Sequence, residues 1–497
     1  MRLTHLISGT DVRGVAMGEA AELTPDAAAR IAAAYGHWLA AKKNKKTGGL
    51  RIGVGMDSRL TGPALKEAIV GGLRDTGAAV YDCGMASTPA MFMSMVTEGY
   101  AYDGAIMITA SHLPAERNGM KFFTPKGGID KPDLVEILKI GESGDDLTIS
   151  QPGPVCKADF MDAYCVLLVE KVRRALGEEK PLVGSHIVVD GGNGAGGFFV
   201  ERVLRPLGAE TAGSQYLEPD GHFPHHAPNP EDREAIAAIS EAVVENKADL
   251  GIIFDADVDR AGAVDHTGKA INRNRLIALM SAIMLREHPG ATIVTDSVTS
   301  TGLARFIETH GGVHHRFKRG YRNVINEAIR LNDAGVECPL AMETSGHGAL
   351  KENYFLDDGA YLMVRVLIEM ARMKREGRDL IDLLRDLAEP CESEEFRIGI
   401  DGDDFKAYGL QVLERLSEAA KAHTDWKPAA DNHEGVRYQK GNGWFMMRLS
   451  LHDPVLPVNM ESDSVGGVKE MARELYGVLK DMDRLDLSSL DQYIKNH

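Results

Sequence analysis

Short apolar runs that each lead into a polar loop recur along this chain, with helix-length segments between them. Such runs lie at residues 50–55, 105–108, 187–190, 250–254 and 292–295. Residues 27–41 and 63–73 have helical patterns, and the first of these follows a capping threonine and a proline, Thr24 and Pro25. Strands that alternate with helices form sheets covered by helices, and ligands gather at the loops after the strands. The pattern predicts an α/β protein.

The length and the net charge of the chain limit its possible number of domains and its possible binding partners. The chain has 497 residues, more than the roughly 250–300 that one hydrophobic core can serve, so several domains are expected. The formal net charge is −17, which argues against nucleic-acid or membrane partners. An anionic substrate would therefore have to meet locally basic residues.

The cysteines and the N-terminal residues give information about the cellular compartment in which the protein is expected. The 5 cysteines are an odd number without CxxC spacing, so neither a zinc site nor a disulfide framework is indicated. No signal-peptide stretch develops near Met1, and no run reaches transmembrane length. A cytoplasmic location is the simplest expectation.

The loop after residues 105–108 contains a candidate nucleophile. Ser111 would lie at the end of a buried strand, with His112 beside it and Lys121 ten residues on. A serine with a histidine and a lysine nearby is typical of a nucleophile or phosphoryl carrier. Taken alone, the segment would be interpreted as an ordinary surface turn, because Ser-His pairs on loops are common.

Three aspartates at alternate positions follow the run at 250–254. Asp255, Asp257 and Asp259 would repel one another unless a cation lay among them. Carboxylate oxygens favour a hard ion, magnesium before calcium or manganese. An EF-hand is excluded because its sixth position is Arg260 and its twelfth is His266.

Two further motifs favour structural roles. The glycine-rich run at 190–197 lacks strict GxGxxG spacing, so a structural turn ranks above a cofactor loop. Three histidines in a proline-rich loop lack a carboxylate or cysteine partner at ligand spacing, so we expect them to serve packing and hydrogen bonding: His222, His225 and His226.

Together these motifs resemble those of the α-D-phosphohexomutases, the family of phosphomannomutases, phosphoglucomutases and phosphoglucosamine mutases. The matching segments are Thr-Ala-Ser-His-x-Pro with Asn-Gly-x-Lys at 109–121, Asp-x-Asp-x-Asp-Arg at 255–260, Asp-x-Arg-Gly at 11–14 and Pro-Asp-Gly-x-Phe-Pro at 219–224. The resemblance implies a phosphorylated Ser111 and a magnesium ion held by Ser111, Asp255, Asp257 and Asp259. It also implies catalytic roles for Arg13, His112, Lys121, Arg260 and His347, without choosing the general base.

Substrate-binding residues follow from the same resemblance. The run Glu-Thr-Ser-Gly-His at 343–347 is similar to the sugar-binding loop, so Glu343, Ser345 and His347 are expected to bind the sugar, with Arg322 as a nearby cation. A strand over 444–450 should lead into the phosphate-binding loop, where Arg448, Ser450 and His452 would bind phosphate. The loop departs from the family, because His452 replaces a threonine and Pro457 lies near the expected second arginine.

The resemblance implies three similar α/β domains with mixed sheets flanked by helices, and a smaller C-terminal α+β domain, around a central cleft. The expected bounds are 1–153, 154–270, 271–388 and 389–497, and they carry the phosphoserine, metal, sugar and phosphate loops in that order. The protein is expected to be a monomer or homodimer.

The implied reaction is reversible interconversion of hexose 1-phosphate and hexose 6-phosphate, with mannose or glucose as the sugar. A bisphosphorylated sugar would be the intermediate and hexose 1,6-bisphosphate the activator. The alternatives are a phosphoglucosamine mutase, a phosphatase that uses the same serine and metal, and an impaired homologue that only binds sugar phosphates.

Overall fold

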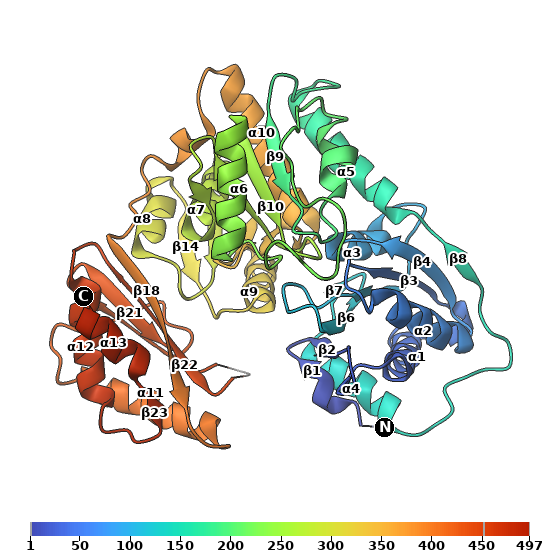
Figure 1. Cartoon of the computed structure of the whole chain (residues 1–497), viewed down its shortest axis with the longest axis horizontal. Coiled ribbons are helices and arrows are strands. Elements are labelled where there is room, and N and C mark those ends of the chain that lie inside the picture. Colours follow the sequence, from blue (N-terminus) through green and yellow to red (C-terminus); the bar gives the residue numbers. More distant parts are fainter. Residues whose placement is uncertain (1, 451–452, 497) are drawn as a thin grey trace. The chain divides into compact units, whose positions relative to one another are not determined.

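A computed structural model describes residues 2–450 and 453–496. Its chain divides into two compact units, the first formed by Met1–Leu276 with Ser345–Asp382 and the second by Ile277–Thr344 with Leu383–His497. Figure 1 shows the ribbon coloured along the sequence. Each unit is described by itself.

The first sheet belongs to the N-terminal part of the first unit. Its strands are β1 (Ile7–Ser8), β2 (Asp11–Val15), β3 (Arg51–Met56), β4 (Ala79–Met85), β5 (Gly104–Ile108), β6 (Arg117–Thr124), β7 (Gly127–Gly128) and β8 (Val155–Lys157). They lie in the order β1-β2-β6-β5-β3-β4-β8, with β7 beside β6. The helices are α1 (Pro25–Lys42), α2 (Gly62–Asp75), α3 (Thr88–Val96) and α4 (Lys131–Glu142). Thr24 caps α1 by accepting a hydrogen bond from the Ala27 amide, as its sequence predicts.

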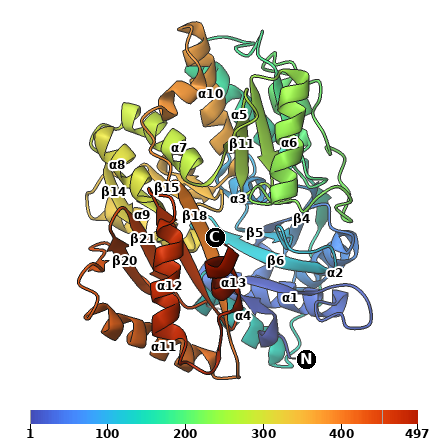
Figure 2. The ribbon, with the colours of Figure 1, turned by 60° about the vertical axis from the view of Figure 1, so that its left-hand side comes forward.

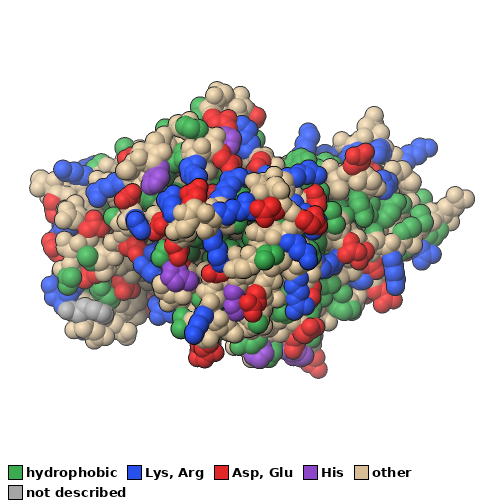
Figure 3. Space-filling view, turned by 90° about the horizontal axis from the view of Figure 1, so that it is seen from above, with side chains coloured by type: hydrophobic (Ala, Val, Ile, Leu, Met, Phe, Trp, Pro, Cys, Tyr) green, Lys and Arg blue, Asp and Glu red, His purple; other side chains and the backbone are tan. Residues whose placement is uncertain are grey.

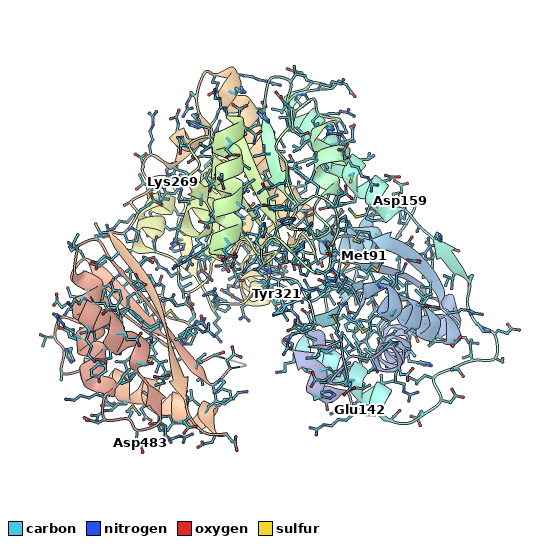
Figure 4. All side chains as sticks on the ribbon, in the orientation of Figure 1. Met91, Glu142, Asp159, Lys269, Tyr321 and Asp483 are labelled. Carbon is cyan, nitrogen blue, oxygen red and sulfur yellow. The ribbon has the colours of Figure 1, made fainter. Side chains whose placement is uncertain are left out.

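Glycines let a helix pack closely on the centre of this sheet. A Cβ atom built on Gly55 of β3 would lie 2.5 Å from Met91 Sδ, and one on Gly53 would lie 2.9 Å from the Tyr102 ring. Met91, labelled in Figure 4, belongs to α3. β3 pairs in parallel with both β4 and β5, so it lies inside the sheet. Its glycines leave room for α3 to approach the sheet at this strand.

The second sheet has the order β12-β11-β10-β9. Its strands are β9 (Ile187–Asp190), β10 (Leu250–Phe254), β11 (Ala261–Asp265) and β12 (Ala270–Ile271), and the helices of this part are α5 (Phe160–Leu176) and α6 (Arg233–Asn246). A single π-helical turn, η3 (Val200–Leu204), follows the glycine-rich run. Val188, Ile253 and Val264 from the sheet pack against Ile239 and Val243 of α6.

The next part of the chain contains β13 (Thr292–Thr295), β14 (Val313–Arg316), β15 (Leu340–Met342), β16 (Gly348–Leu350) and β17 (Leu356–Asp357). In the second unit β13 pairs in parallel with β14 and β15, and in the first unit β16 pairs with β17. The helices are α7 (Arg273–Glu287), α8 (Thr301–Thr309), α9 (Tyr321–Asp333) and α10 (Gly359–Arg375). Short 3₁₀ turns occur at η1 (Thr4–Leu6), η2 (Thr47–Gly49), η4 (Lys351–Asn353) and η5 (Leu380–Leu384).

The C-terminal sheet lies in the second unit, in the order β19-β20-β21-β22-β18-β23. Its strands are β18 (Glu392–Ile400), β19 (Lys427–Pro428), β20 (Val436–Lys440), β21 (Gly443–Met447), β22 (Val455–Ser462) and β23 (Leu485–Asp486). Helices α11 (Phe405–Ala420), α12 (Gly467–Leu479) and α13 (Ser488–Asn496) cover one face of the sheet, as Figures 1 and 2 show. That face carries the core of the domain, with Ile398, Met447 and Val458 against Leu416 and Leu475.

The expected domain bounds remain a proposal. β8 lies just beyond the expected first boundary at residue 153 and pairs with β4 of the first sheet. None of the helices within the described residues combines the length and apolar character needed to cross a bilayer. On the face shown in Figure 3, basic, acidic and hydrophobic side chains are intermixed.

The histidines of the proline-rich loop have structural partners. His225 stacks on Tyr216 with 4.0 Å between ring centroids, and exposed His222 lies 2.8 Å from Asp220. Buried His226 places Nε2 3.0 Å from Asp190 Oδ2 and Nδ1 2.8 Å from the Ala227 carbonyl. These contacts agree with the packing and hydrogen-bonding roles expected for the three histidines.

The His226–Asp190 pair should make stability depend on pH. Burial favours a lower pKa for His226, but the hydrogen bond and charge of Asp190 outweigh it and raise the pKa. The pair should therefore stabilise the fold fully below the ordinary histidine pKa of about 6.5, and this contribution should be lost as pH rises through the raised value.

The midpoint of thermal unfolding checks this expectation. Relative to His226→Gln, the wild type should have its largest advantage near pH 5.5 and a smaller one at pH 8.5. His222→Gln is the control, since its exposed pair with Asp220 contributes little. An advantage that stays constant over this pH range would contradict the interpretation.

Candidate active site

The loop that carries Ser111 lies at the carboxyl end of β5, beside the loop that follows β3. The two strands pair in parallel, with Met56 opposite Ile108, so the residues after them meet at one edge of the sheet. The Ser111 amide donates to Thr109 Oγ1 at 2.8 Å, and that hydroxyl donates to Asp57 Oδ2 at 2.6 Å. Ser111 is buried with φ at 52°, an unusual left-handed backbone for a non-glycine residue. The loop is held in a fixed, strained form.

Arg59 fixes the same loop, a role that was not predicted from the sequence. Its guanidinium donates to the carbonyls of Ser111 and Leu113 at 2.6 Å, and to those of Pro114 and Arg117 at 2.8 Å. The side chain is fully buried, with Nε 3.5 Å from Asp57 Oδ2. Arg59 lies three residues after the end of β3, the strand that pairs with β5. A charged residue in the loop after a neighbouring strand was the signal that could have revealed this positioning residue.

The aspartate loop follows β10 and meets the Ser111 loop within the first unit. One carboxylate oxygen from each of Asp255, Asp257 and Asp259 lies within 4.8 Å of the others, and all three residues are buried. Oδ1 of Asp257 and Oδ1 of Asp259 are buried without a hydrogen-bond partner among the described residues. Burial, together with the charges of Asp259 and Asp257, raises the pKa of Asp255 well above its ordinary value. A divalent cation would satisfy the orphaned oxygens and relieve the repulsion, so the residues fit a hard metal ion.

The backbone of the aspartate loop is packed against two glycines. A Cβ atom on Gly194 would lie 2.6 Å from Ala256 Cα, and one on Gly359 would lie 2.7 Å from the Arg260 carbonyl group. The glycine-rich run at 190–197 therefore supports the loop by close packing, in line with the structural role predicted for it. Val258 adopts φ of 65° and is fully buried. A β-branched residue resists this conformation, which costs roughly 1–3 kcal/mol.

Ser111 Oγ lies where the two loops meet. It donates to Asp255 Oδ2 at 2.9 Å, and Arg260 Nη2 lies 3.4 Å from it. Arg260 also donates through Nε to Asp255 Oδ2 at 3.1 Å, and the exposed His112 places Nδ1 3.3 Å from Ser111 Oγ. The hydroxyl therefore has a carboxylate, a guanidinium and an imidazole within reach.

Lys121 neutralises the other side of the triad. Its Nζ lies 2.7 Å from Asp257 Oδ2 and 2.5 Å from Asp259 Oδ2. Burial opposes ionisation of Asp259, but the positive charges of Lys121 and Arg260 prevail and lower its pKa. The Thr88 hydroxyl, at the start of α3, donates to Asp257 Oδ2 at 2.5 Å. This second contact was not foreseen from the sequence either.

His347 and Arg13 lie in the same unit as the triad. His347 Nδ1 is 2.8 Å from Ser345 Oγ, and its Nε2 is 3.8 Å from Asp259 Oδ1. Burial, opposed by Asp259 and assisted by Arg260, lowers the pKa of His347 to about 3, which leaves the ring neutral at physiological pH. Arg13 on β2 forms an ion pair with Asp11 at 3.0 Å.

The remaining predicted substrate-binding residues lie in the second unit. Buried Glu343 follows β15, and its Oε1 accepts from the Gly320 amide at 2.5 Å. Arg322 is in the first turn of α9, next to Tyr321, which Figure 4 labels. Neighbouring Thr344 donates through Oγ1 to Asp296 Oδ2 at 2.7 Å. The hydrogen of the Thr344 hydroxyl is therefore already donated to a carboxylate of the protein.

The predicted phosphate loop begins where β21 ends. Arg448 directly follows the strand, and Ser450 Oγ accepts from the Asp453 amide at 3.2 Å. The prediction of a strand through residue 450 is wrong at its end, since β21 stops at Met447. His452 lies outside the described residues.

Comparison with known proteins identifies the family. Residues 5–146, 162–268 and 272–391 match the families described as phosphoglucomutase/phosphomannomutase, alpha/beta/alpha domains I, II and III. A phosphoglucomutase of Neisseria gonorrhoeae is 32% identical over 472 residues, covering 95% of each chain. A phosphomannomutase/phosphoglucomutase of Pseudomonas putida is 32% identical over 417 residues, 83% of this chain and 84% of the relative.

A solved structure shares the architecture. The crystal structure of a phosphoglucomutase/phosphomannomutase family protein from Burkholderia thailandensis has a TM-score of 0.80 and 28% identity, covering 97% of this chain and 98% of its own. The three matched α/β domains and the further β-rich C-terminal domain agree with the fold expected from the sequence. The chain belongs to the phosphoglucomutase/phosphomannomutase family of α-D-phosphohexomutases, which are isomerases.

Proposed function

We propose that this phosphohexomutase interconverts hexose 1-phosphate and hexose 6-phosphate of glucose or mannose through a phosphoserine at position 111. The observation that carries the proposal is the buried contact of 2.9 Å between Ser111 Oγ and Asp255, inside a carboxylate triad with two orphaned oxygens. Family membership supports a sugar phosphate as the substrate. The activator is proposed to be hexose 1,6-bisphosphate.

The first half-reaction moves the phosphoryl group from Ser111 to the sugar. A sugar hydroxyl oxygen forms a bond to phosphorus, the bond from phosphorus to Ser111 Oγ breaks, and the hydroxyl proton passes to a base while Ser111 Oγ takes up a proton. Among the proposed catalytic residues described, His112 and Arg260 have nitrogen atoms within 3.4 Å of Ser111 Oγ. The second half-reaction reverses these steps with the other phosphate of the bisphosphorylated sugar.

Charge neutralisation is the main demand of phosphoryl transfer. Asp255, Asp257 and Asp259 would hold a magnesium ion together with an oxygen on Ser111, and the ion would stabilise the charge that moves between the oxygens. Arg260 aims its guanidinium at Ser111 Oγ, and Lys121 balances the two aspartates that it contacts. Arg13 is proposed to add to this positive field.

Substrate recognition is assigned to the residues of the sugar and phosphate loops. Glu343, Ser345 and His347 would bind the ring hydroxyls, and Arg322 would provide a cation for the substrate. Arg448, Ser450 and His452 would bind the phosphate that is not being transferred, once in each half-reaction. Carboxylates and hydroxyls discriminate sugar epimers through hydrogen bonds, so Glu343 and Ser345 would set the preference for glucose or mannose.

Two measurements test the proposal. Intact mass should show one added phosphate on the purified protein, and peptide mapping should place it on Ser111. Glucose 1-phosphate or mannose 1-phosphate should be converted in the presence of magnesium and a trace of glucose 1,6-bisphosphate. EDTA should stop the reaction, and added magnesium should restore it. Conversion of glucosamine 1-phosphate alone would favour the phosphoglucosamine mutase alternative, whereas no turnover of any of the three would refute the proposal.

A further inference from the structure

Three residues form a row across the C-terminal sheet, next to the phosphate loop. Arg397 of β18 lies opposite Pro457 of β22, and the Arg448 amide donates to the Pro457 carbonyl at 3.1 Å. The neighbouring residues Ile398, Met447 and Val458 belong to the core under the helices. These three residues face the helices α11, α12 and α13, which lie over one face of the sheet in the ribbon of Figure 2. Because side chains alternate along strands, the row Arg448–Pro457–Arg397 faces the other way. Two arginines therefore share one face, with a single proline between them.

Pro457 determines the local form of this face. Proline has no amide hydrogen, so it cannot return a hydrogen bond to the Arg448 carbonyl, and the ladder between β21 and β22 ends there. This explains why β21 stops at Met447. Since the Pro457 carbonyl points to β21, its pairing with Arg397 is of the non-hydrogen-bonded kind, in which side chains are closest.

The two guanidinium groups are weakly engaged by the protein. Arg448 has no ion pair or side-chain hydrogen bond within the described residues, and its buried Nε lacks a partner. Arg397 is 56% exposed, and its contacts with Asp453 Oδ2 at 3.6 Å and Glu395 Oε1 at 3.8 Å are long. Arg448 and Arg397 lie on either side of Pro457 on three neighbouring strands, so their Cα atoms are roughly 10 Å apart. Two arginine side chains are long enough to bind one phosphate group from both sides across this distance.

We propose that Arg397 supplies the second guanidinium that binds the substrate's non-transferring phosphate, together with Arg448. The proposal rests on the function proposed above. A phosphate with two negative charges would replace Asp453 and Glu395 as the partner of Arg397 through bidentate hydrogen bonds. Arg397, on a different strand, would thus replace the second phosphate-binding arginine that the family resemblance leads us to expect near Pro457.

Kinetics of three variants test this assignment. Arg397→Ala should raise KM for hexose 1-phosphate roughly 10- to 100-fold with kcat little changed, because the contact is made in both ground and transition states. Arg397→Lys should recover part of the loss, since it keeps the charge without the bidentate geometry. Arg415→Ala is the matched control, an exposed arginine on α11, and should behave as the wild type. Equal KM values for Arg397→Ala and Arg415→Ala would overturn the proposal.

Direct binding separates this proposal from the enzyme's function. Calorimetric titration of glucose 1-phosphate into the Ser111→Ala protein measures affinity without turnover, and adding Arg397→Ala should weaken it by a similar factor. A wild type that is inactive on all sugar phosphates, yet whose Ser111→Ala form binds glucose 1-phosphate through Arg397, would refute the mutase function alone. Unchanged affinity with an active wild type would refute the role of Arg397 alone.

A double-mutant cycle with Asp453, the partner of Arg397, provides a further test. Asp453→Asn frees Arg397 from its counterion and should lower KM roughly two- to fivefold in the wild-type background. The same substitution should have a much smaller effect when Arg397 is alanine, because the two residues act as a pair. An equal decrease of KM in both backgrounds would mean that Asp453 acts independently, which contradicts the proposal.

Discussion

Replacing Ser111 with alanine is expected to reduce mutase turnover by on the order of 10⁴-fold or more and to leave the fold intact. In the proposed mechanism Ser111 Oγ carries the phosphoryl group, so neither half-reaction can proceed without it. The remaining partners of Asp255 should preserve the loop, since Arg260 still donates to it through Nε and through its backbone amide. Turnover of glucose 1-phosphate, intact mass and the midpoint of thermal unfolding should be measured together.

A matched control is Ser143→Ala, which changes an exposed serine after α4. It should keep both the added phosphate and wild-type turnover. Retention of the phosphate in Ser111→Ala, or turnover within tenfold of the wild type, would show that another residue carries the phosphoryl group. Loss of activity accompanied by a large fall in the unfolding midpoint would instead indicate a structural role for Ser111.

Replacing Arg59 with alanine should lower the free energy of unfolding of the N-terminal domain by roughly 3–5 kcal/mol, because it removes one partner of a buried ion pair. Four loop carbonyls would lose their donor, and Asp57 would lose its cation. Hydrogen exchange of residues 109–117 should accelerate more than that of other loops. Turnover should fall too, since Ser111 would no longer be held in its left-handed conformation.

The effect of Arg59→Ala should grow with pH. Burial raises the pKa of Asp57 to about 6 even though the charge of Arg59 opposes the increase, and removal of Arg59 should raise it further. The variant would then bind a proton on folding at pH values where the wild type does not. The stability gap should therefore widen by up to about 1.4 kcal/mol per pH unit above pH 6.

Arg117→Ala is the control for this prediction. Arg117 is an exposed arginine at the start of β6, where the Ser111 loop ends, and its carbonyl would still accept from Arg59. Its unfolding midpoint should match that of the wild type at every pH. If the two arginine variants were equally stable, the carbonyl contacts of Arg59 would not be what holds the Ser111 loop.

Much of the fold follows from local sequence patterns. Thr24 and Pro25 mark the start of α1, and the apolar runs before Ser111 and Asp255 are β5 and β10. The meeting of Ser111 and Asp255 is different, because their strands belong to separate sheets. No rule of periodicity brings two sheets together, and this contact was expected only from the resemblance to the mutases.

The parts that sequence reasoning missed are the supporting contacts. Arg59 and Thr88 act through hydrogen bonds over long sequence separations, which neither composition nor spacing reveals. The early end of β21 depends on Pro457 in the partner strand, which becomes visible only when the register is known. Arg397 was overlooked for the same reason.

The glycine contacts of the aspartate loop also determine which sequence changes the loop can tolerate. Side chains at Gly194 or Gly359 would collide with the backbone of the aspartate loop, so mutations at these two positions are expected to distort the loop. Because neighbouring segments impose the backbone path, the residues between the three aspartates can change identity, even to a β-branched valine at 258, without moving the carboxylates. Sequence changes between the three aspartates should therefore leave the positions of the carboxylates unaltered, and the constraint falls on Gly194 and Gly359, which are distant in sequence.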